Sequence, residues 1–65
     1  MSGGGHVIIR LQARDIANTS VVLDNCDQAK RPRLEAILAK DPANWTVFEF
    51  RFVLKRIEEA HDALC

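Results

Sequence analysis

Apolar and polar side chains alternate along the first patterned stretch of the chain, residues 6–14. The apolar positions of this period-two pattern are Val7, Ile9, Leu11 and Ala13. Alternation that includes β-branched residues is typical of a half-buried strand. Residues 15–19 have turn-forming chemistry, and residues 20–23 are a second short run with strand propensity. The simplest interpretation is a β-hairpin over residues 6–23.

A helix from Asp15 to about Lys30, with Asp15 as its cap, is the alternative for part of this region. Asn18, Thr19 and Val22 have poor helix propensity, which disfavours that helix. We therefore expect the hairpin.

A short helix is predicted for Pro32–Lys40, between two breaks in the pattern. Proline is favoured in the first turn of a helix, where its missing N–H is not needed. Leu34, Ile37 and Leu38 then form one apolar stripe. Asp41 precedes a second proline and therefore avoids the helical region, which ends the helix.

The last and longest element is predicted to be an amphipathic helix. Thr46 and Glu49 have the spacing of a capping box at its start, and Asn44 is a competing cap. Apolar residues then recur with alternating spacings of three and four, as in a heptad repeat. This heptad seam consists of Val47, Phe50, Leu54, Ile57, His61 and Leu64.

Three further aromatic residues, Trp45, Phe48 and Phe52, lie on the opposite side of that helix. The helix would then be apolar on two faces over its first turns and on one face later. The region also alternates strictly, so a strand from Trp45 to Val53 is the alternative. The capping box and the continuous seam favour the helix.

Together these elements predict an α+β fold with an N-terminal β-hairpin, a short helix and a long C-terminal amphipathic helix that carries most of the core. An all-α helical hairpin or three-helix arrangement is the alternative. Residues 1–5, with three consecutive glycines, are expected to be a flexible N-terminus. Residues 6–65 are expected to form a single small domain.

The chain is too short to be very stable alone. Its 65 residues are 48% hydrophobic and 28% charged, which is the composition of a globular domain. A core of this size rarely supplies more than ~3–5 kcal/mol without a disulfide, a metal or a second subunit. We therefore expect an oligomer or a subunit bound to a partner.

The net charge is zero, with nine basic and nine acidic residues, so no general attraction to phosphate or to an anionic membrane is expected. No apolar run approaches the ~20 residues that span a bilayer, and residues 1–5 lack the features of a signal peptide. Cys26 and Cys65 form no CxxC pair and are expected to be reduced. We expect a cytoplasmic protein.

The residues with catalytic or metal-binding chemistry form no complete site. His61 and Cys65 are four residues apart on one predicted helix face, and only His6 and Cys26 remain to complete a four-ligand zinc site. Glu58 and His61 have the spacing of a di-iron half-site, which would need further carboxylates. The sequence contains no nucleophile elbow, phosphate-binding loop or dinucleotide fingerprint. We expect no enzymatic activity, no cofactor and no metal.

A protein–protein interaction module is the function that the pattern favours: a small adaptor, inhibitor or regulatory subunit, expected to act as a homodimer. Its long helix would dock in a partner's apolar groove through the second aromatic stripe or through the heptad seam. The predicted partner-binding residues are Trp45, Phe48, Arg51, Phe52, Lys55 and Arg56. In this interpretation Phe50→Asp and Leu54→Asp unfold the protein, whereas Phe48→Asp leaves a folded monomer.

A nucleic-acid-associated regulator is the alternative function. Its local basic patch would consist of Arg10, Arg14, Lys30, Arg31 and Arg33. The zero net charge and the lack of aromatic residues between these positions make it the less favoured function.

Overall fold

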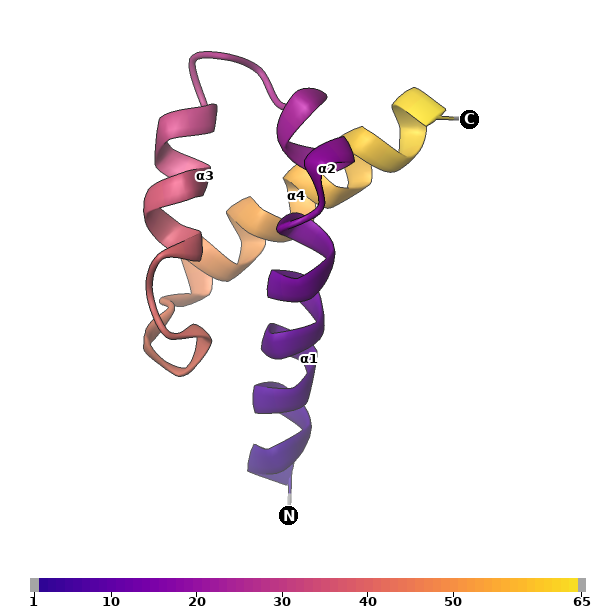
Figure 1. The fold of residues 1–65 in the computed structure, drawn as a ribbon. Coiled ribbons are helices and arrows are strands. Elements are labelled where there is room, and N and C mark those ends of the chain that lie inside the picture. Colours follow the sequence, from indigo (N-terminus) through magenta and orange to yellow (C-terminus); the bar gives the residue numbers. More distant parts are fainter. Residues whose placement is uncertain (1, 65) are drawn as a thin grey trace.

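The computed structural model describes residues 2–64, with the side chains of residues 9–64, and this part of the chain is helical and contains no strand. The elements are α1 (Ser2–Ala17), α2 (Ser20–Asp24), α3 (Arg31–Leu38), the 3₁₀ turn η1 (Pro42–Asn44) and α4 (Val47–Leu64). Figure 1 shows α1 crossing α4, and α1, α2 and α3 each contact α4. The predicted α+β fold is therefore wrong, and the all-α alternative fits the structure.

Helix propensity and small side chains explain why the first stretch is α1 and not a strand. Residues 10–14 (Arg-Leu-Gln-Ala-Arg) all favour a helix. The buried residues of this stretch are Ala13 and Ala17, which are four positions apart and so lie on one helix face. Ile9 and Leu11, which the alternating pattern assigned to the core, are exposed.

A break at Asn18 and Thr19 separates α1 from α2, so the alternative helix from Asp15 to Lys30 is wrong as well. The Thr19 hydroxyl donates a hydrogen bond of 2.8 Å to the carbonyl of Ile16. The same oxygen accepts the N–H of Val22 at 3.4 Å. Thr19 therefore closes the end of one helix and caps the next, which is the ordinary use of threonine at a helix start.

The prediction of a short helix is confirmed by α3, which ends two residues before the predicted bound. Leu34, Ile37 and Leu38 form its buried stripe. Asp41 then begins the 3₁₀ turn, because its carboxylate accepts the N–H of Ala43 at 3.1 Å.

The capping box at the start of α4 is also confirmed. Thr46 Oγ1 accepts the N–H of Glu49 at 3.1 Å, and Glu49 Oε1 accepts the N–H of Thr46 at 2.9 Å. Asn44 ends the 3₁₀ turn and does not cap α4. The region is helical from Val47 onward, so the alternative strand from Trp45 to Val53 is wrong.

The molecule measures 36 × 24 × 17 Å, and since a helix with its side chains is ~10–12 Å across, it is about two helices thick. The core lies between these layers and consists of Ala13, Ala17, Val22, Cys26, Leu34, Ile37, Leu38, Trp45, Val53 and Ala60. In a molecule this thin, α4 is covered on one side only. No helix among residues 2–64 is both long and apolar enough to cross a membrane.

Candidate protein-docking surface

The heptad seam of α4 lies beside the core and not in it. The buried residues of α4 are Val53, Arg56 and Ala60, and the seam is centred about a quarter turn from them at 3.6 residues per turn. The two ends of the seam are the most open, with Val47 55% and Leu64 69% exposed. Its central residues pack against the core but remain half-buried. The stripe that the sequence assigned to the core therefore lies beside the core.

Small side chains in α1 explain why the seam is covered only in part. Ala13 and Ala17 are the buried residues of α1 from Ile9 onward, and they allow a close approach to α4. Ile9 and Ile16 are seven residues apart and so lie on one side of α1. Both isoleucines are about half exposed. Ile9 and Ile16 thus border the seam and leave it partly exposed.

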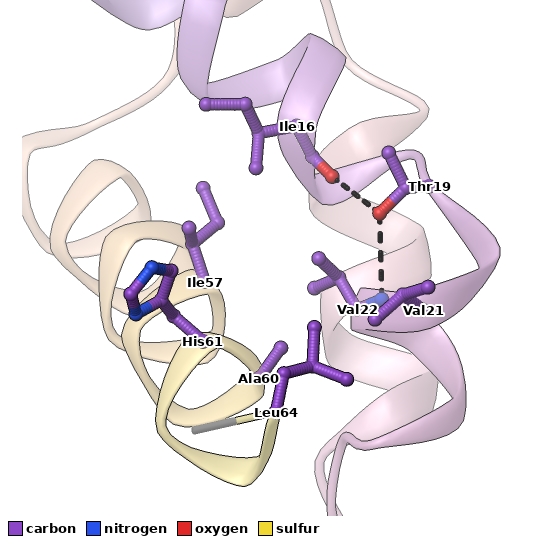
Figure 2. Close-up of a pocket in the computed structure, with 8 residues that line it drawn as sticks. All are labelled: Ile16, Thr19, Val21, Val22, Ile57, Ala60, His61 and Leu64. Atoms are coloured by element: carbon purple, nitrogen blue, oxygen red, sulfur yellow. Dashed lines mark hydrogen bonds between the residues drawn. The ribbon is translucent and has the colours of Figure 1, made fainter.

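A groove of about 260 Å³ lies between the C-terminal half of α4 and the end of α1 with α2. Figure 2 shows the apolar side chains that converge on it from the two sides. The residues that line this C-terminal groove are Ile16, Thr19, Val21, Val22, Ile57, Ala60, His61 and Leu64. Apart from the imidazole of His61 and the hydroxyl of Thr19, its side chains are aliphatic.

A second groove of about 330 Å³ lies between α1 and the N-terminal half of α4. The residues that line this N-terminal groove are Ile9, Arg10, Val47, Phe50, Arg51 and Leu54. The guanidinium of Arg10 lies 5.7 Å from the centre of the Phe50 ring, so the basic side chain covers part of an aromatic one.

Half of the heptad seam lies in each groove, and the seam together with the apolar residues of α1 and α2 beside it defines a surface. We name this surface the docking face: the heptad seam together with Ile9, Ile16 and Val21. It follows the whole length of α4. A row of exposed apolar side chains this long is unusual on a small monomer and is typical of an interaction surface.

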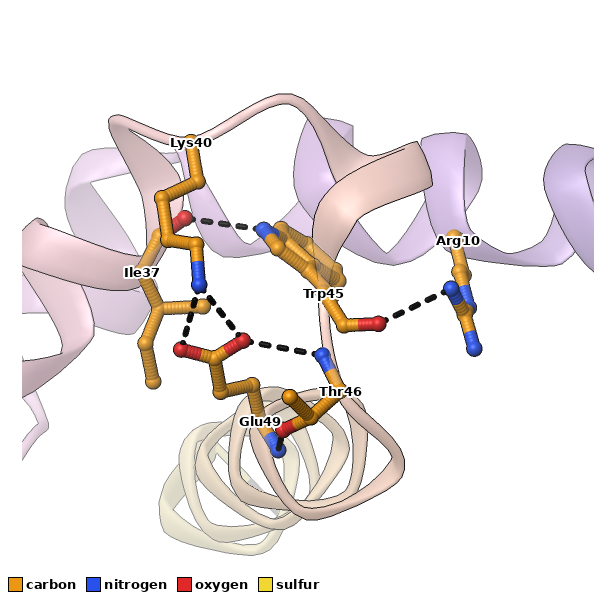
Figure 3. A network of polar contacts seen from close by, with 6 residues as sticks. All are labelled: Arg10, Ile37, Lys40, Trp45, Thr46 and Glu49. Atoms are coloured by element: carbon orange, nitrogen blue, oxygen red, sulfur yellow. Dashed lines mark hydrogen bonds and ion pairs between the residues drawn. The ribbon is translucent and has the colours of Figure 1, made fainter.

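Trp45, a predicted partner-binding residue, is instead a core residue with 3% of its surface exposed. Its indole N–H donates to the carbonyl of Ile37 at 2.8 Å, and its own carbonyl accepts from Arg10 at 3.0 Å (Figure 3). Close by, the ammonium of Lys40 donates to both carboxylate oxygens of Glu49 at 2.9 and 2.8 Å. The hydrogen bond from Lys40 lowers the pKa of the Glu49 carboxyl. This network joins α1, the end of α3 and the start of α4.

Phe52 and Arg56 are likewise held inside the subunit. Arg56 is 5% exposed, and its guanidinium lies 4.6 Å from the centre of the Phe52 ring. Its Nη2 donates to Glu59 at 2.9 Å, while its Nε lies 2.9 Å from the other carboxylate oxygen without making a hydrogen bond. Arg33 of α3 lies 5.1 Å from the same ring. These contacts fasten α3 to α4.

Cys26 is a buried free thiol near this arginine. Burial raises the pKa of the thiol above its usual value, and the charge of Arg56 only partly offsets that effect. The protonated thiol is a poor nucleophile, so its environment favours packing over chemistry.

The other predicted partner-binding residues, Phe48, Arg51 and Lys55, are exposed. Phe48 is 77% exposed and lines neither groove. Phe48 and Lys55 lie on the outer side of α4, away from α1, whereas Arg51 lies at the edge of the N-terminal groove. The structure thus divides the predicted set: Trp45 and Arg56 are buried, Phe52 is half-buried, and the other three residues are exposed.

The predicted basic patch is divided as well. The guanidinium of Arg10 is bonded to Trp45, beyond the C-terminal end of α3, and Arg14 is half-buried. The other three cations lie at the opposite, N-terminal end of α3. There, Arg31 pairs with Glu35 at 3.4 Å.

The predicted metal ligands do not form a site in the described part of the chain. Residues 2–64 contain no cluster of three or more histidine, cysteine or acidic side chains. Cys65 lies outside the described residues, so its predicted pairing with His61 is not placed.

Sequence reasoning missed the contribution of α1 and α2 to the docking face. Ile9, Ile16 and Val21 were read as strand or turn residues, although the seven-residue spacing of the two isoleucines fits one side of a helix. Comparison of the chain with protein-family models, with curated proteins and with solved structures gives no match. Its function must therefore be sought in its own geometry.

Proposed function

We propose that this protein is a protein–protein interaction module that works as a homodimer through the docking face. The observation that carries the proposal is the heptad seam, which follows α4 from end to end beside the core, with both of its ends exposed and its central residues only half-buried. Heptad seams are surfaces on which a second helix packs by inserting side chains between those of the first. A helix packed in the groove between α1 and the seam would cover both.

The small size of the core also supports the proposal. A 65-residue chain about two helices thick buries few large side chains completely. Chains of this size commonly need oligomerisation, a metal or disulfides for their stability. Cys26 is a free thiol in the core, so it contributes no disulfide. Docking with a second chain would supply the additional stability.

A cytoplasmic location is part of the same proposal. A buried, unpaired cysteine is compatible with a reducing compartment, where thiols do not form disulfides. Oxidation of Cys26 would introduce polar atoms into the core next to Arg56, and a reducing environment prevents that damage.

The variant Val47→Asp tests the proposal. Val47 lies in the N-terminal groove, and the new carboxylate would have to be buried in the interface. We expect the wild type to sediment as a dimer and Val47→Asp to sediment as a folded monomer. An aspartate in the first turn of α4 is favourable for the helix dipole, so lost association would not reflect lost folding.

Phe48→Asp is the matched control. It is the next residue in the same helical turn and receives the same change, but it lies outside both grooves. We expect Phe48→Asp to remain dimeric, with the far-ultraviolet circular dichroism of both variants unchanged. A monomeric wild type at high concentration, or dissociation by Phe48→Asp but not by Val47→Asp, would contradict the proposal.

A further inference from the structure

The pattern of the docking face also determines how two copies fit together, an inference that rests on the proposed function. We propose that α4 of one copy packs antiparallel to α4 of the second copy, and that Arg51 of each copy pairs with Glu58 of the other. The order of seam residues, the charges beside the seam and the place of α1 each support this arrangement.

The seam has the same spacing in both directions, which an antiparallel pair requires. Its steps are three, four, three, four and three residues, from Val47 to Leu64. Aligned antiparallel about the middle of α4, Val47 of one copy meets Leu64 of the other. The same alignment places Leu54 opposite Ile57, and every seam residue finds a seam residue as its neighbour.

The charges beside the seam are complementary in this alignment. Arg51 and Glu58 are seven residues apart, exposed, and on the same flank of the seam. Among the described residues neither of them makes an ion pair. In an antiparallel pair the equivalent flanks of the two helices face each other, so each Arg51 lies beside a Glu58 of the other copy. The two-fold axis forms this pair twice.

The position of α1 disfavours a parallel pair. The flank of the seam opposite Arg51 and Glu58 consists of Val53 and Ala60, which are buried in the core. A parallel pair would bring the charged flank of one copy against this apolar flank of the other, which α1 already covers. Arg51 and Glu58 would then face apolar side chains and have no oppositely charged partner, which is unfavourable.

The size of the interface that such a dimer needs is compatible with the length of the docking face. A standard interface buries ~800 Å² on each partner, which is about a fifth of the 4453 Å² surface of this chain. The face runs along the 18-residue length of α4 through the six seam residues and continues onto Ile9, Ile16 and Val21 of α1 and α2. The second copy's α4 would lie along both grooves.

Charge-reversal variants test the pairing. Arg51→Glu alone places two glutamates together at each of the two pairs, and Glu58→Arg alone places two arginines together. We expect each single variant to dimerise about tenfold more weakly than the wild type at low salt, since like charges across an interface repel. A mixture of the two variants restores both opposite-charge pairs, so we expect it to form a heterodimer of near wild-type affinity. Native mass spectrometry separates this heterodimer from either homodimer by mass.

Lys55→Glu is the control for a general effect of charge. It carries the same change on an exposed cation of the same helix, but on the outer side of α4, and we expect its dimerisation to equal that of the wild type. If the wild type dimerises while the mixture associates no better than the single variants, the antiparallel pairing is wrong. The proposed function as a homodimeric interaction module would still be supported. If the wild type is a monomer throughout, the proposed function fails as well.

Discussion

Trp45 shows how one residue can connect most of a small fold. It lies between η1 and α4, is almost fully buried, and uses both of its polar groups. The indole N–H is bonded to the last turn of α3, and the carbonyl is bonded to Arg10 of α1. Trp45 thus connects α1 and α3 to the turn that precedes α4.

We expect Trp45→Phe to destabilise the protein by about 2 kcal/mol, because it shortens a buried side chain and leaves the carbonyl of Ile37 without a donor. Urea unfolding followed by circular dichroism measures this loss. Phe48→Leu, an equally conservative change of an exposed aromatic residue, should alter stability by less than about 0.5 kcal/mol. Equal losses in the two variants would contradict the role assigned to Trp45.

Glu49 should make the stability depend on pH. The hydrogen bond from Lys40 lowers the pKa of its carboxyl in the folded protein, so folding favours the charged form. The resulting stabilisation is fully present above the ordinary glutamate value of about 4.5 and is lost as the pH falls through the lowered folded value.

Glu49→Gln isolates this effect, because the amide oxygen can still accept the Thr46 N–H of the capping box but carries no charge for Lys40. The wild type should be more stable than Glu49→Gln at pH 7. Thermal unfolding of both proteins from pH 7 downward should show the difference disappear in acid. A difference that stays constant down to the lowest pH would show that the charge of Glu49 is irrelevant.

At the scale of elements, the sequence predicted the last two helices and not the first two. The capping box of Thr46 and Glu49 and the stripe of Leu34, Ile37 and Leu38 are local signals, and both are present in the structure. The alternation from Val7 to Ala13 is just as local but misleading. Ile9 and Leu11 of this stretch are exposed, because the described part of α1 packs through Ala13 and Ala17.

The crossing of α1 over α4 should be sensitive to the size of Ala17. This side chain is completely buried, so Ala17→Leu would force α1 away from α4 and cost about 1–3 kcal/mol. Ala36→Leu in α3 is the matched control, since Ala36 is exposed and leucine is also a good helix former. Chemical unfolding should separate the two variants, and equal midpoints would show that the crossing tolerates extra volume.

At the scale of the whole molecule, sequence reasoning predicted that α4 is too apolar for one subunit to cover. It could not predict which stripe stays uncovered. That choice depends on where α1 crosses, which the burial of Ala13 and Ala17 determines. It also depends on the turn before α4, which buries Trp45 separately from Phe48.

The response to salt should distinguish apolar docking from binding to phosphate. Between 50 and 500 mM NaCl we expect dimerisation to weaken by no more than about tenfold, because only the two exposed ion pairs are screened. Fluorescence anisotropy with a labelled DNA duplex should show no binding at physiological salt. Binding to the duplex that falls steeply with salt would instead favour the nucleic-acid function of the basic residues.

Because the molecule is only about two helices thick, few substitutions in α4 affect one side of the helix alone. Each turn of α4 carries, within a few residues of one another, side chains that hold the subunit together and side chains of the docking face. A substitution that rotates or tilts α4 to relieve crowding in the core must also displace the docking face. If the docking face binds a partner as proposed, selection for a stable subunit and selection for that partner act on the same 18-residue helix, and neither property can change far without the other.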